Sequence, residues 1–308
     1  MDGDESDFYG DDDTTSALEH RVSVFNPTQW WKATLTAPPP LMTIKPPTDS
    51  PVPDTSICDD QQNPMEGLPF AWQVGETAAS FAARLPPSST IETESVPCIY
   101  VCNPHMNLTV RHADWQSRQS RGNEYEGPEV KGALFKTAHD GALERLNILH
   151  RFLMGLEKVR KPQSFKTLEA NAEKATAIKN IMHLSHTCRM HSGKWMLVID
   201  RKLIDQVWKS IVQATLNNTL GVAAKVQPAN NPDKGPPRKE HLISVYTRDY
   251  TDTGDVKRVL LRLKELNLLT ARPIYYKPDI FTYVGIAYNN KYDIRASLYS
   301  SKDFALKG

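Results

Sequence analysis

The side chains best suited to bind a ligand lie near the C-terminal end of the sequence. Lys277, Asp279, Tyr283, Lys291 and Arg295 combine cations, a carboxylate and an aromatic ring in a region of expected turns. Cations bind phosphate oxygens, and an aromatic ring can stack on a nucleic-acid base. This group predicts a phosphate-binding site in which the lysines and the arginine contact phosphate and Tyr283 stacks. The same residues also fit a tight turn in which Lys277 and Asp279 form an internal ion pair.

A further cation is expected on the same surface. The alternation of residues 221–227 predicts a half-buried strand that places Lys225 and Gln227 on one face. Lys225 would then meet phosphate as a point charge. Trp115 lies among arginines and is the alternative to Tyr283 as a stacking ring.

Motifs for catalysis or metal binding do not emerge. The sequence contains no Gly-x-Ser-x-Gly, His-Glu-x-x-His or dinucleotide-binding pattern, and no pair of nucleophile and general base is evident. His183, His186, Cys188 and His191 are metal-ligating residue types, but they include one thiolate and match no standard zinc-finger spacing. We therefore expect a non-enzymatic protein without a metal or another cofactor.

The elements that position these residues follow from the spacing of apolar side chains. Steps of three and four residues predict two long helices within residues 143–182, separated by Lys161 and Pro162. They also predict a helix with Trp208 in its core-facing stripe and another that begins at Asp252 or Thr253. In the second long helix the expected core stripe is Leu168, Ala172, Ala175, Ile178 and Met182. Apolar runs predict strands at residues 98–102, 194–199, 221–227, 241–247, 274–276, 283–288 and 296–300.

Composition divides the chain at residue 97. Residues 1–97 carry a net charge of −12 and many prolines, which predicts a mostly disordered acidic arm. Residues 98–308 are expected to form the folded domain, and residues 189–308 alone carry a net charge of +9. The arm also contains aromatic islands with Trp30, Trp31 and Trp72 and a helical signal at residues 76–85. These islands either dock on the folded body, which we favour, or bind a partner as linear motifs.

The remaining composition limits the cellular context. The N-terminus is acidic and lacks an apolar core, so we expect no secretory signal. No apolar run approaches the roughly 18 residues typical of a membrane span, so no membrane association is expected. Four cysteines in 308 residues do not suggest a disulfide framework. These features predict a cytoplasmic, or alternatively nuclear, protein.

Several segments resemble known families. Gly-Lys-Trp-Met-Leu at residues 193–197, Gly-Val-Ala-Ala-Lys-Val at 221–226 and Ile-Ser-Val-Tyr-Thr at 243–247 resemble the core of the mRNA cap-binding translation initiation factors. Tyr-Tyr-Lys-Pro-Asp at 275–279, Thr-Tyr-Val-Gly-Ile at 282–286 and Ser-Leu-Tyr-Ser-Ser at 297–301 are similar to the basophilic-leukaemia-expressed protein family, an uncharacterised eukaryotic group. The resemblance covers residues 98–301. It implies an α+β domain with a curved antiparallel sheet, helices on one face and a concave ligand-binding face on the other.

The resemblance departs from the cap-binding pattern at the ligand. Those factors clamp methylated guanine between two tryptophans, and a glutamate beside one of them reads the base edge. The corresponding residues 183–192 contain no Trp-Glu pair, and Gln227 stands where an arginine would meet the cap phosphates. This argues against true methylated-cap binding. What remains implied is an RNA- or nucleotide-binding protein that uses a basic concave face.

A protein–protein adaptor is the alternative function. Its partner would bind the aromatic arm, through Trp30, Trp31 and Trp72, or the helices behind the sheet. Binding that depends on the arm but ignores a charge reversal at Lys225 would favour the adaptor.

Overall fold

The computed structural model describes residues 63–106, 126–128, 132–270 and 272–304. All of these residues lie within one compact unit, residues 58–308. Among the helices of the described residues, none is both long and apolar enough to cross a membrane.

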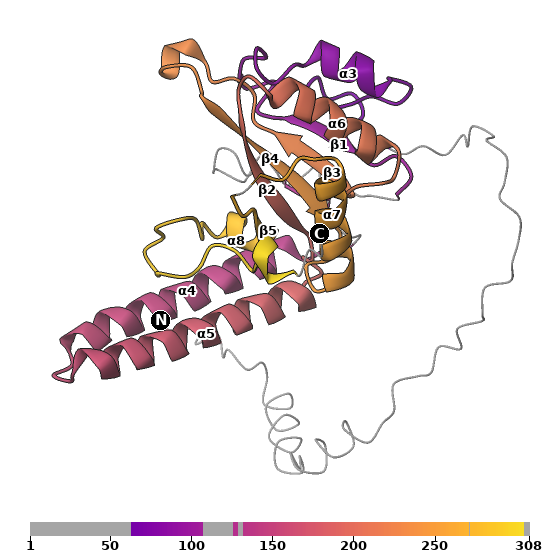
Figure 1. The fold of residues 1–308 in the computed structure, drawn as a ribbon. Coiled ribbons are helices and arrows are strands. Elements are labelled where there is room, and N and C mark those ends of the chain that lie inside the picture. Colours follow the sequence, from indigo (N-terminus) through magenta and orange to yellow (C-terminus); the bar gives the residue numbers. More distant parts are fainter. Residues whose placement is uncertain (1–62, 107–125, 129–131, 271, 305–308) are drawn as a thin grey trace, which may run out of the picture. The chain divides into compact units, whose positions relative to one another are not determined.

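An antiparallel sheet forms the centre of this unit (Figure 1). In the described residues its strands are β1 (Ile99–Cys102), β2 (Gly193–Asp200), β3 (Ala223–Val226), β4 (Glu240–Thr247), β5 (Tyr275–Pro278) and β6 (Tyr299–Ser300). Their order in the sheet is β1-β3-β4-β2-β5-β6, and every pair is antiparallel. The curved antiparallel sheet with helices confirms the predicted α+β class.

Three helices and the main core cover one face of the sheet. They are α3 (Ala78–Arg84), α6 (Ile204–Leu216) and α7 (Thr253–Glu265). Trp195 and Leu197 of β2 point into this core, where they meet Trp208 of α6 and Leu260 of α7. Trp208 is fully buried, as its position in the apolar stripe predicts. The Asp252 side chain caps α7 by accepting a hydrogen bond from the Asp255 amide, which confirms the predicted helix start.

The opposite face of the sheet carries polar side chains. Strand register places Lys194 opposite both Tyr246 and Lys277, and it places Lys225 opposite Ser244. Directly paired residues in antiparallel strands project from the same face. These residues therefore share one surface, away from the helix-covered core.

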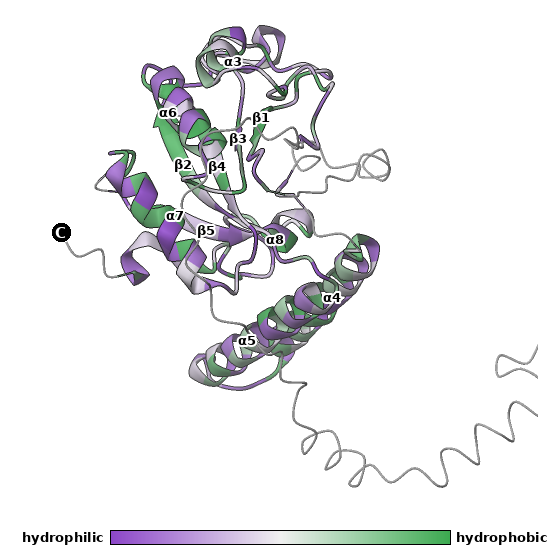
Figure 2. Cartoon of the chain, turned by 90° about the vertical axis from the view of Figure 1, so that its right-hand side faces the viewer, coloured by the Kyte–Doolittle hydropathy of each residue, from purple (hydrophilic) through white to green (hydrophobic). Residues whose placement is uncertain are grey.

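A helical hairpin lies beside the sheet (Figures 1 and 2). Its helices are α4 (Phe135–Lys158) and α5 (Gln163–Thr187), and the break between them falls at the predicted Lys161 and Pro162. The hairpin packs against the short helix α8 (Asp279–Tyr283) and residues 284–294. Two short 3-10 helices, η2 (Pro232–Lys234) and η3 (Ser301–Asp303), complete the described elements.

The predicted core stripe of α5 is wrong in its outer half. Leu168 is 66% exposed, and Ala172 and Ala175 are exposed as well. The buried side chains are instead those of Ala177, Ile181 and Ser185. Apolar residues occupy both sides of this helix, so spacing alone could not select the packed side.

The predicted strand at residues 283–288 is also wrong. Tyr283 ends α8, and Gly285 follows with a φ of +74°, a left-handed conformation that glycine adopts without strain. Pairing confirms the other two C-terminal strands, as β5 and β6.

Residues 63–97 form part of this folded unit, although the sequence suggested a mostly disordered arm up to residue 97. Phe81 of α3 packs on Trp208, with ring centroids 6.4 Å apart. Trp72 is buried, and its Nε1 donates to the Glu76 carbonyl oxygen at 2.7 Å. The prolines here flank α3 instead of interrupting it, so their number misled the prediction. The aromatic island that contains Trp72 therefore docks on the folded body, which is the alternative that we favoured.

Candidate anion-binding site

A cavity of about 430 Å³ opens on the polar face of the sheet. It lies where β3, β4, β2 and β5 run side by side, and its volume falls within the roughly 300–1,000 Å³ typical of small-molecule sites. The lining residues are Glu92, Pro97, Cys98, Glu126, Lys194, Met196, Lys225, Gln227, Arg238, Leu242, Ser244, Lys277 and Thr282.

Strand alternation delivers three lysines to this cavity. Lys194 alternates with the core residue Trp195 in β2, and Lys277 alternates with buried Tyr276 in β5. Lys225 reaches the same surface from β3. Because these positions are fixed by backbone pairing, the lysine side chains start from rigid elements.

Glu126 forms the floor of the cavity. Its carboxylate accepts hydrogen bonds from the ammonium groups of Lys194 and Lys225, the latter at 2.9 Å, and from the Tyr246 hydroxyl at 2.8 Å. The Tyr100 hydroxyl donates to the Glu126 carbonyl oxygen at 2.9 Å. Burial alone would raise the pKa of the Glu126 carboxyl, but the charges of Lys194 and Lys225 outweigh it and hold the pKa at about 2. Glu126 therefore stays ionised.

Asp279 is the second carboxylate beneath the cavity. It accepts from the Lys194 ammonium at 3.0 Å, from the Ser192 hydroxyl at 2.6 Å and from the Gly127 amide at 3.0 Å. A Cβ atom at Gly127 would lie 2.7 Å from the carboxylate and 2.8 Å from the Tyr246 ring. Glycine is thus required at residue 127 for the backbone to approach this closely.

Lys194 is locked into this network. Its ammonium also donates to the Thr282 hydroxyl at 2.9 Å, and its side chain is 4% exposed. Burial would lower the pKa of Lys194, but the charges of Asp279 and Glu126 raise it overall. Lys194 is a permanent cation with its hydrogen-bonding capacity used by the protein.

Lys277 differs from its neighbour Lys194 in having no partner within the described part of the chain. The residue is only 9% exposed, yet among the described residues its ammonium forms no hydrogen bond or ion pair. Burial, followed by the positive charge of Lys194, lowers its pKa to about 8, against the opposing effect of Glu126 and Asp279. Its polar end faces the cavity and is available to a ligand.

The charges of the lining favour an anion. Four cations, Lys194, Lys225, Arg238 and Lys277, surround two carboxylates, Glu92 and Glu126. Arg238 pairs with Glu92 at 3.4 Å, and Lys194 and Lys225 pair with the carboxylates beneath the cavity. Among the described residues, these ion pairs leave the Lys277 charge uncompensated. Met196 and Leu242 add an apolar wall. Such a mixed site can hold a compact anion joined to an apolar or aromatic group.

The structure brings together two of the predicted phosphate-binding residues. Lys225 and Lys277 both line the cavity. Arg295 lies elsewhere, where its Nε donates to the Ser297 hydroxyl, and the Lys291 ammonium lies over the Tyr292 ring at 5.0 Å. The predicted internal ion pair between Lys277 and Asp279 does not form, because Asp279 pairs with Lys194.

Tyr283, the predicted stacking residue that the structure describes, does not line the cavity. Tyr283 packs edge-on against Phe135 of α4, with centroids 4.8 Å apart, so it belongs to the contact between helices. Trp115, Trp30 and Trp31 lie outside the described residues.

An aromatic ring that the sequence analysis did not single out lies beside the cavity. Tyr275 pairs with the lining residue Met196 across β5 and β2, so it shares the cavity face, and it is 44% exposed. Its position two residues before Lys277 was the available signal, since residues two apart in a strand share a face. Glu126 and Arg238 offered no such signal, because they reach the site through loops.

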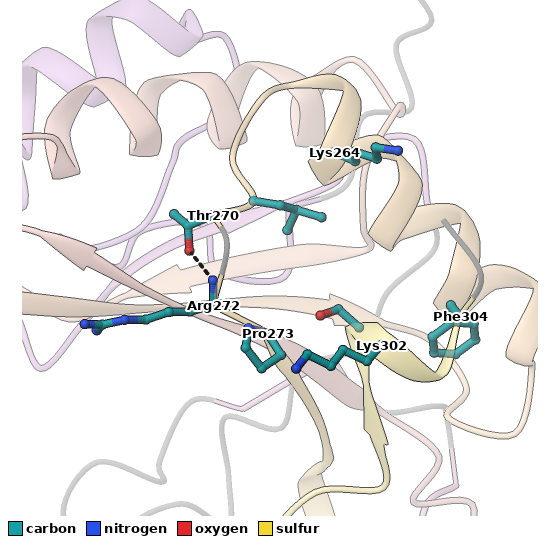
Figure 3. A pocket seen from close by; sticks show the side chains of 8 residues that line it. Lys264, Thr270, Arg272, Pro273, Lys302 and Phe304 are labelled. Carbon is teal, nitrogen blue, oxygen red and sulfur yellow. Dashed lines mark hydrogen bonds between the residues drawn. The ribbon is translucent and has the colours of Figure 1, made fainter. Parts of the chain in front are cut away.

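A second hollow lies near the C-terminal end of α7 (Figure 3). It has a volume of about 410 Å³ and three lining cations, Lys264, Arg272 and Lys302. Figure 3 shows these side chains pointing in different directions. Because Arg272 and Lys302 are also exposed, water screens their charges. This hollow lacks the convergence of the cavity on the sheet.

A metal centre is not evident in the part of the chain that the structure describes, where no three His, Cys, Asp or Glu side chains converge. The rings of His186 and His191 stack with centroids 4.5 Å apart, and His191 hydrogen-bonds the His186 carbonyl oxygen. The cysteines at residues 98, 102 and 188 are buried free thiols.

Comparison with known proteins shows the family of this chain. One similar solved structure is that of Ascaris suum eIF4E-3 with an m2,2,7G cap, at 22% sequence identity and a TM-score of 0.24. The match covers 29% of this chain and 52% of that one, so this chain spans about half of the length of that factor. The model of the family described as basophilic leukemia-expressed protein Bles03 matches residues 18–285. The chain therefore belongs to the Bles03 family.

Proposed function

We propose that the protein binds a nucleotide, free or at the end of an RNA chain, in the cavity on the polar face of its sheet. The observation that carries the proposal is Lys277, a residue 9% exposed that lines the cavity and whose ammonium forms no hydrogen bond or ion pair among the described residues. The protein would act as a non-enzymatic binding protein. Its ligand would place phosphate oxygens against Lys277 and its base toward Tyr275.

The free-energy cost of burying most of Lys277 without a counter-charge supports a role for this residue in ligand binding. A largely buried charge that lacks a counter-charge is destabilising, so this lysine lowers the stability of the unliganded fold. Lys277 contributes no hydrogen bond to the network of Glu126 and Asp279. A phosphate group would supply the missing counter-charge through a charge-assisted hydrogen bond.

The apolar side of the cavity suits a base. The exposed Tyr275 ring could stack on a base, while Met196 and Leu242 would cover the sugar or the base edge. Gln227 carries an amide that can donate to base acceptors. This arrangement offers one ring in place of the two-ring clamp of cap-binding proteins, so selectivity for a methylated cap is not part of the proposal.

Calorimetric titration of the full chain with GTP, ADP and a short 5′-triphosphorylated RNA tests the proposal. Lys277→Met should weaken binding about ten- to a hundredfold, because a hydrogen bond to a charged group contributes about 1.5–3 kcal/mol. Lys136→Met is the matched control, since that lysine is 92% exposed on α4. Absence of binding to all three ligands, or equal effects of the two variants, would overturn the proposal.

Titration with pyrophosphate separates the two halves of the site. Tyr275→Ala should weaken GTP binding about tenfold and leave pyrophosphate binding unchanged, because stacking contributes about 1–3 kcal/mol per base. Equal loss for both ligands would mean that Tyr275 supports the cavity and does not contact a base.

A second candidate function is a protein adaptor that uses the α4–α5 hairpin. The observation in its favour is the exposed apolar side chains near the end of the hairpin, which include Phe165 and Leu168 of α5 and Phe152 of α4. Lys158, Arg160, Lys161 and Lys166 surround the turn of this hairpin. A basic rim around apolar side chains suits an amphipathic helix with an acidic polar face.

A further inference from the structure

Lys277 has the surroundings of a nucleophilic amine. A lysine can attack a carbonyl carbon only in its neutral form, and desolvation or a neighbouring cation favours that form. Both conditions hold here. The residue is 9% exposed, and Lys194, whose charge is fixed by two carboxylates, is its partner in strand register.

We propose that the Lys277 amine forms an imine with the carbonyl group of a small anionic aldehyde that enters the cavity. Imine formation adds a reversible covalent step to the noncovalent binding described above, and it rests on the proposed function only for the way in which the cavity holds the anion.

The reaction needs no co-reactant. The lone pair of the neutral amine attacks the carbonyl carbon and gives a carbinolamine. The carbonyl oxygen then leaves as water, taking with it the two protons of the amine, and a carbon–nitrogen double bond remains. No group is oxidised or reduced. The cavity of about 430 Å³ accommodates a small phosphorylated aldehyde beside the lysine.

The other lysines of the cavity are poor candidates for this attack. Lys194 donates to Glu126, Asp279 and Thr282, and Lys225 donates to Glu126. Loss of a proton from either would leave a buried carboxylate without its counter-charge. These two lysines therefore remain cations that attract the anionic part of the ligand, while Lys277 is free to react.

The titration of Lys277 agrees with this division. Its pKa of about 8 leaves about half of the amine neutral at pH 8, whereas an ordinary exposed lysine is almost fully protonated there. The charged groups that act on it are Lys194 of β2, Glu126 and Asp279, with Lys225 and Arg238 on the same cavity wall.

Labelling of the full chain with pyridoxal 5′-phosphate at pH 8 tests the inference. Brief exposure followed by borohydride converts an imine into a stable secondary amine, which peptide mass mapping locates. We expect Lys277 to be modified at least tenfold faster than exposed lysines such as Lys136. Lys277→Arg should abolish this rapid labelling, and Lys136→Arg should leave it unchanged.

Pyridoxal, which lacks the phosphate, separates this inference from the proposed function. Rapid labelling of Lys277 by both aldehydes would support the reactive amine and count against the anion site. Rapid labelling by pyridoxal 5′-phosphate alone, suppressed by excess GTP, would support both. Labelling of Lys277 no faster than Lys136 would overturn the inference, even if calorimetry shows that GTP binds.

Discussion

Lys194 and Lys277 face each other across β2 and β5, and they differ in what surrounds their ammonium groups. Lys194 meets two carboxylates and a hydroxyl, while Lys277 meets the open cavity. The same residue type thus serves two purposes in one row of the sheet. The buried network of Lys194 holds the floor together, whereas the Lys277 charge, which has no partner among the described residues, is the one that we propose binds the ligand.

Removal of these two lysines should have opposite effects on stability. Lys194→Met leaves Glu126 and Asp279 short of a buried counter-charge, so we expect the free energy of unfolding to fall by about 3–5 kcal/mol. Lys277→Met removes an uncompensated buried charge, so we expect a gain on the order of 1–3 kcal/mol at pH 7. Urea unfolding of the two variants beside the wild type measures both. A loss of stability in Lys277→Met would show that the lysine has a structural partner.

The stability difference between wild type and Lys277→Met should depend on pH. Lysine in the unfolded chain titrates near 10.5 and in the folded protein near 8, so the unfolded state binds more protons between these values. Wild-type stability therefore rises relative to the variant as pH increases from 8 to 10.5. Unfolding curves at pH 7, 9 and 10.5 should show the gap closing, and a constant gap would contradict the lowered pKa.

At the scale of elements, local patterns predicted most of the strands and helices. β2 and β4 have continuous apolar runs, and α6 and α7 have clear one-sided stripes, so their positions follow from sequence. The predicted half-buried strand placed Lys225 and Gln227 on one face, and both line the cavity. The predictions failed where tertiary packing decides, as in the buried side of α5.

The position of Glu126 at the floor of the cavity could not be predicted either, because tertiary packing decides it. Glu126 lies 68 residues before Lys194 in the chain and 99 before Lys225, and no local pattern connects them. Lys291 and Arg295 illustrate the opposite error. They are close to Lys277 in sequence, but the turns after α8 direct them elsewhere. Proximity in sequence is a poor guide to convergence outside regular elements.

The α4–α5 hairpin allows a test of the adaptor hypothesis. Leu168→Asp replaces a 66% exposed side chain, so we expect stability to change by less than about 0.5 kcal/mol. If the hairpin binds an acidic amphipathic helix, a pull-down with Leu168→Asp should no longer recover the partner protein. The same pull-down with Lys277→Met should still recover it. Unchanged capture by Leu168→Asp would exclude this surface.

At the scale of the whole molecule, the uneven charge distribution bears on ligand access. Residues 189–308 carry a net charge of +9, and residues 1–97 carry −12. A cationic site that binds a phosphorylated ligand should show affinity that falls as salt rises. We expect GTP affinity to drop between 50 and 300 mM NaCl, with a shallower slope for Lys277→Met. Affinity that is independent of salt would argue for an apolar mode of binding.

The titration of Lys277 is the most direct test of whether its ammonium, which has no partner among the described residues, binds an anion. NMR of the protein labelled with ¹³C-lysine, with the Lys277 signal assigned through Lys277→Arg, gives its pKa with and without saturating GTP. We predict a pKa of about 8 in the free protein and a clear rise when GTP binds, because the phosphate stabilises the charged form. A pKa near 10.5 in the free protein, or one that saturating GTP leaves unchanged, would contradict the account.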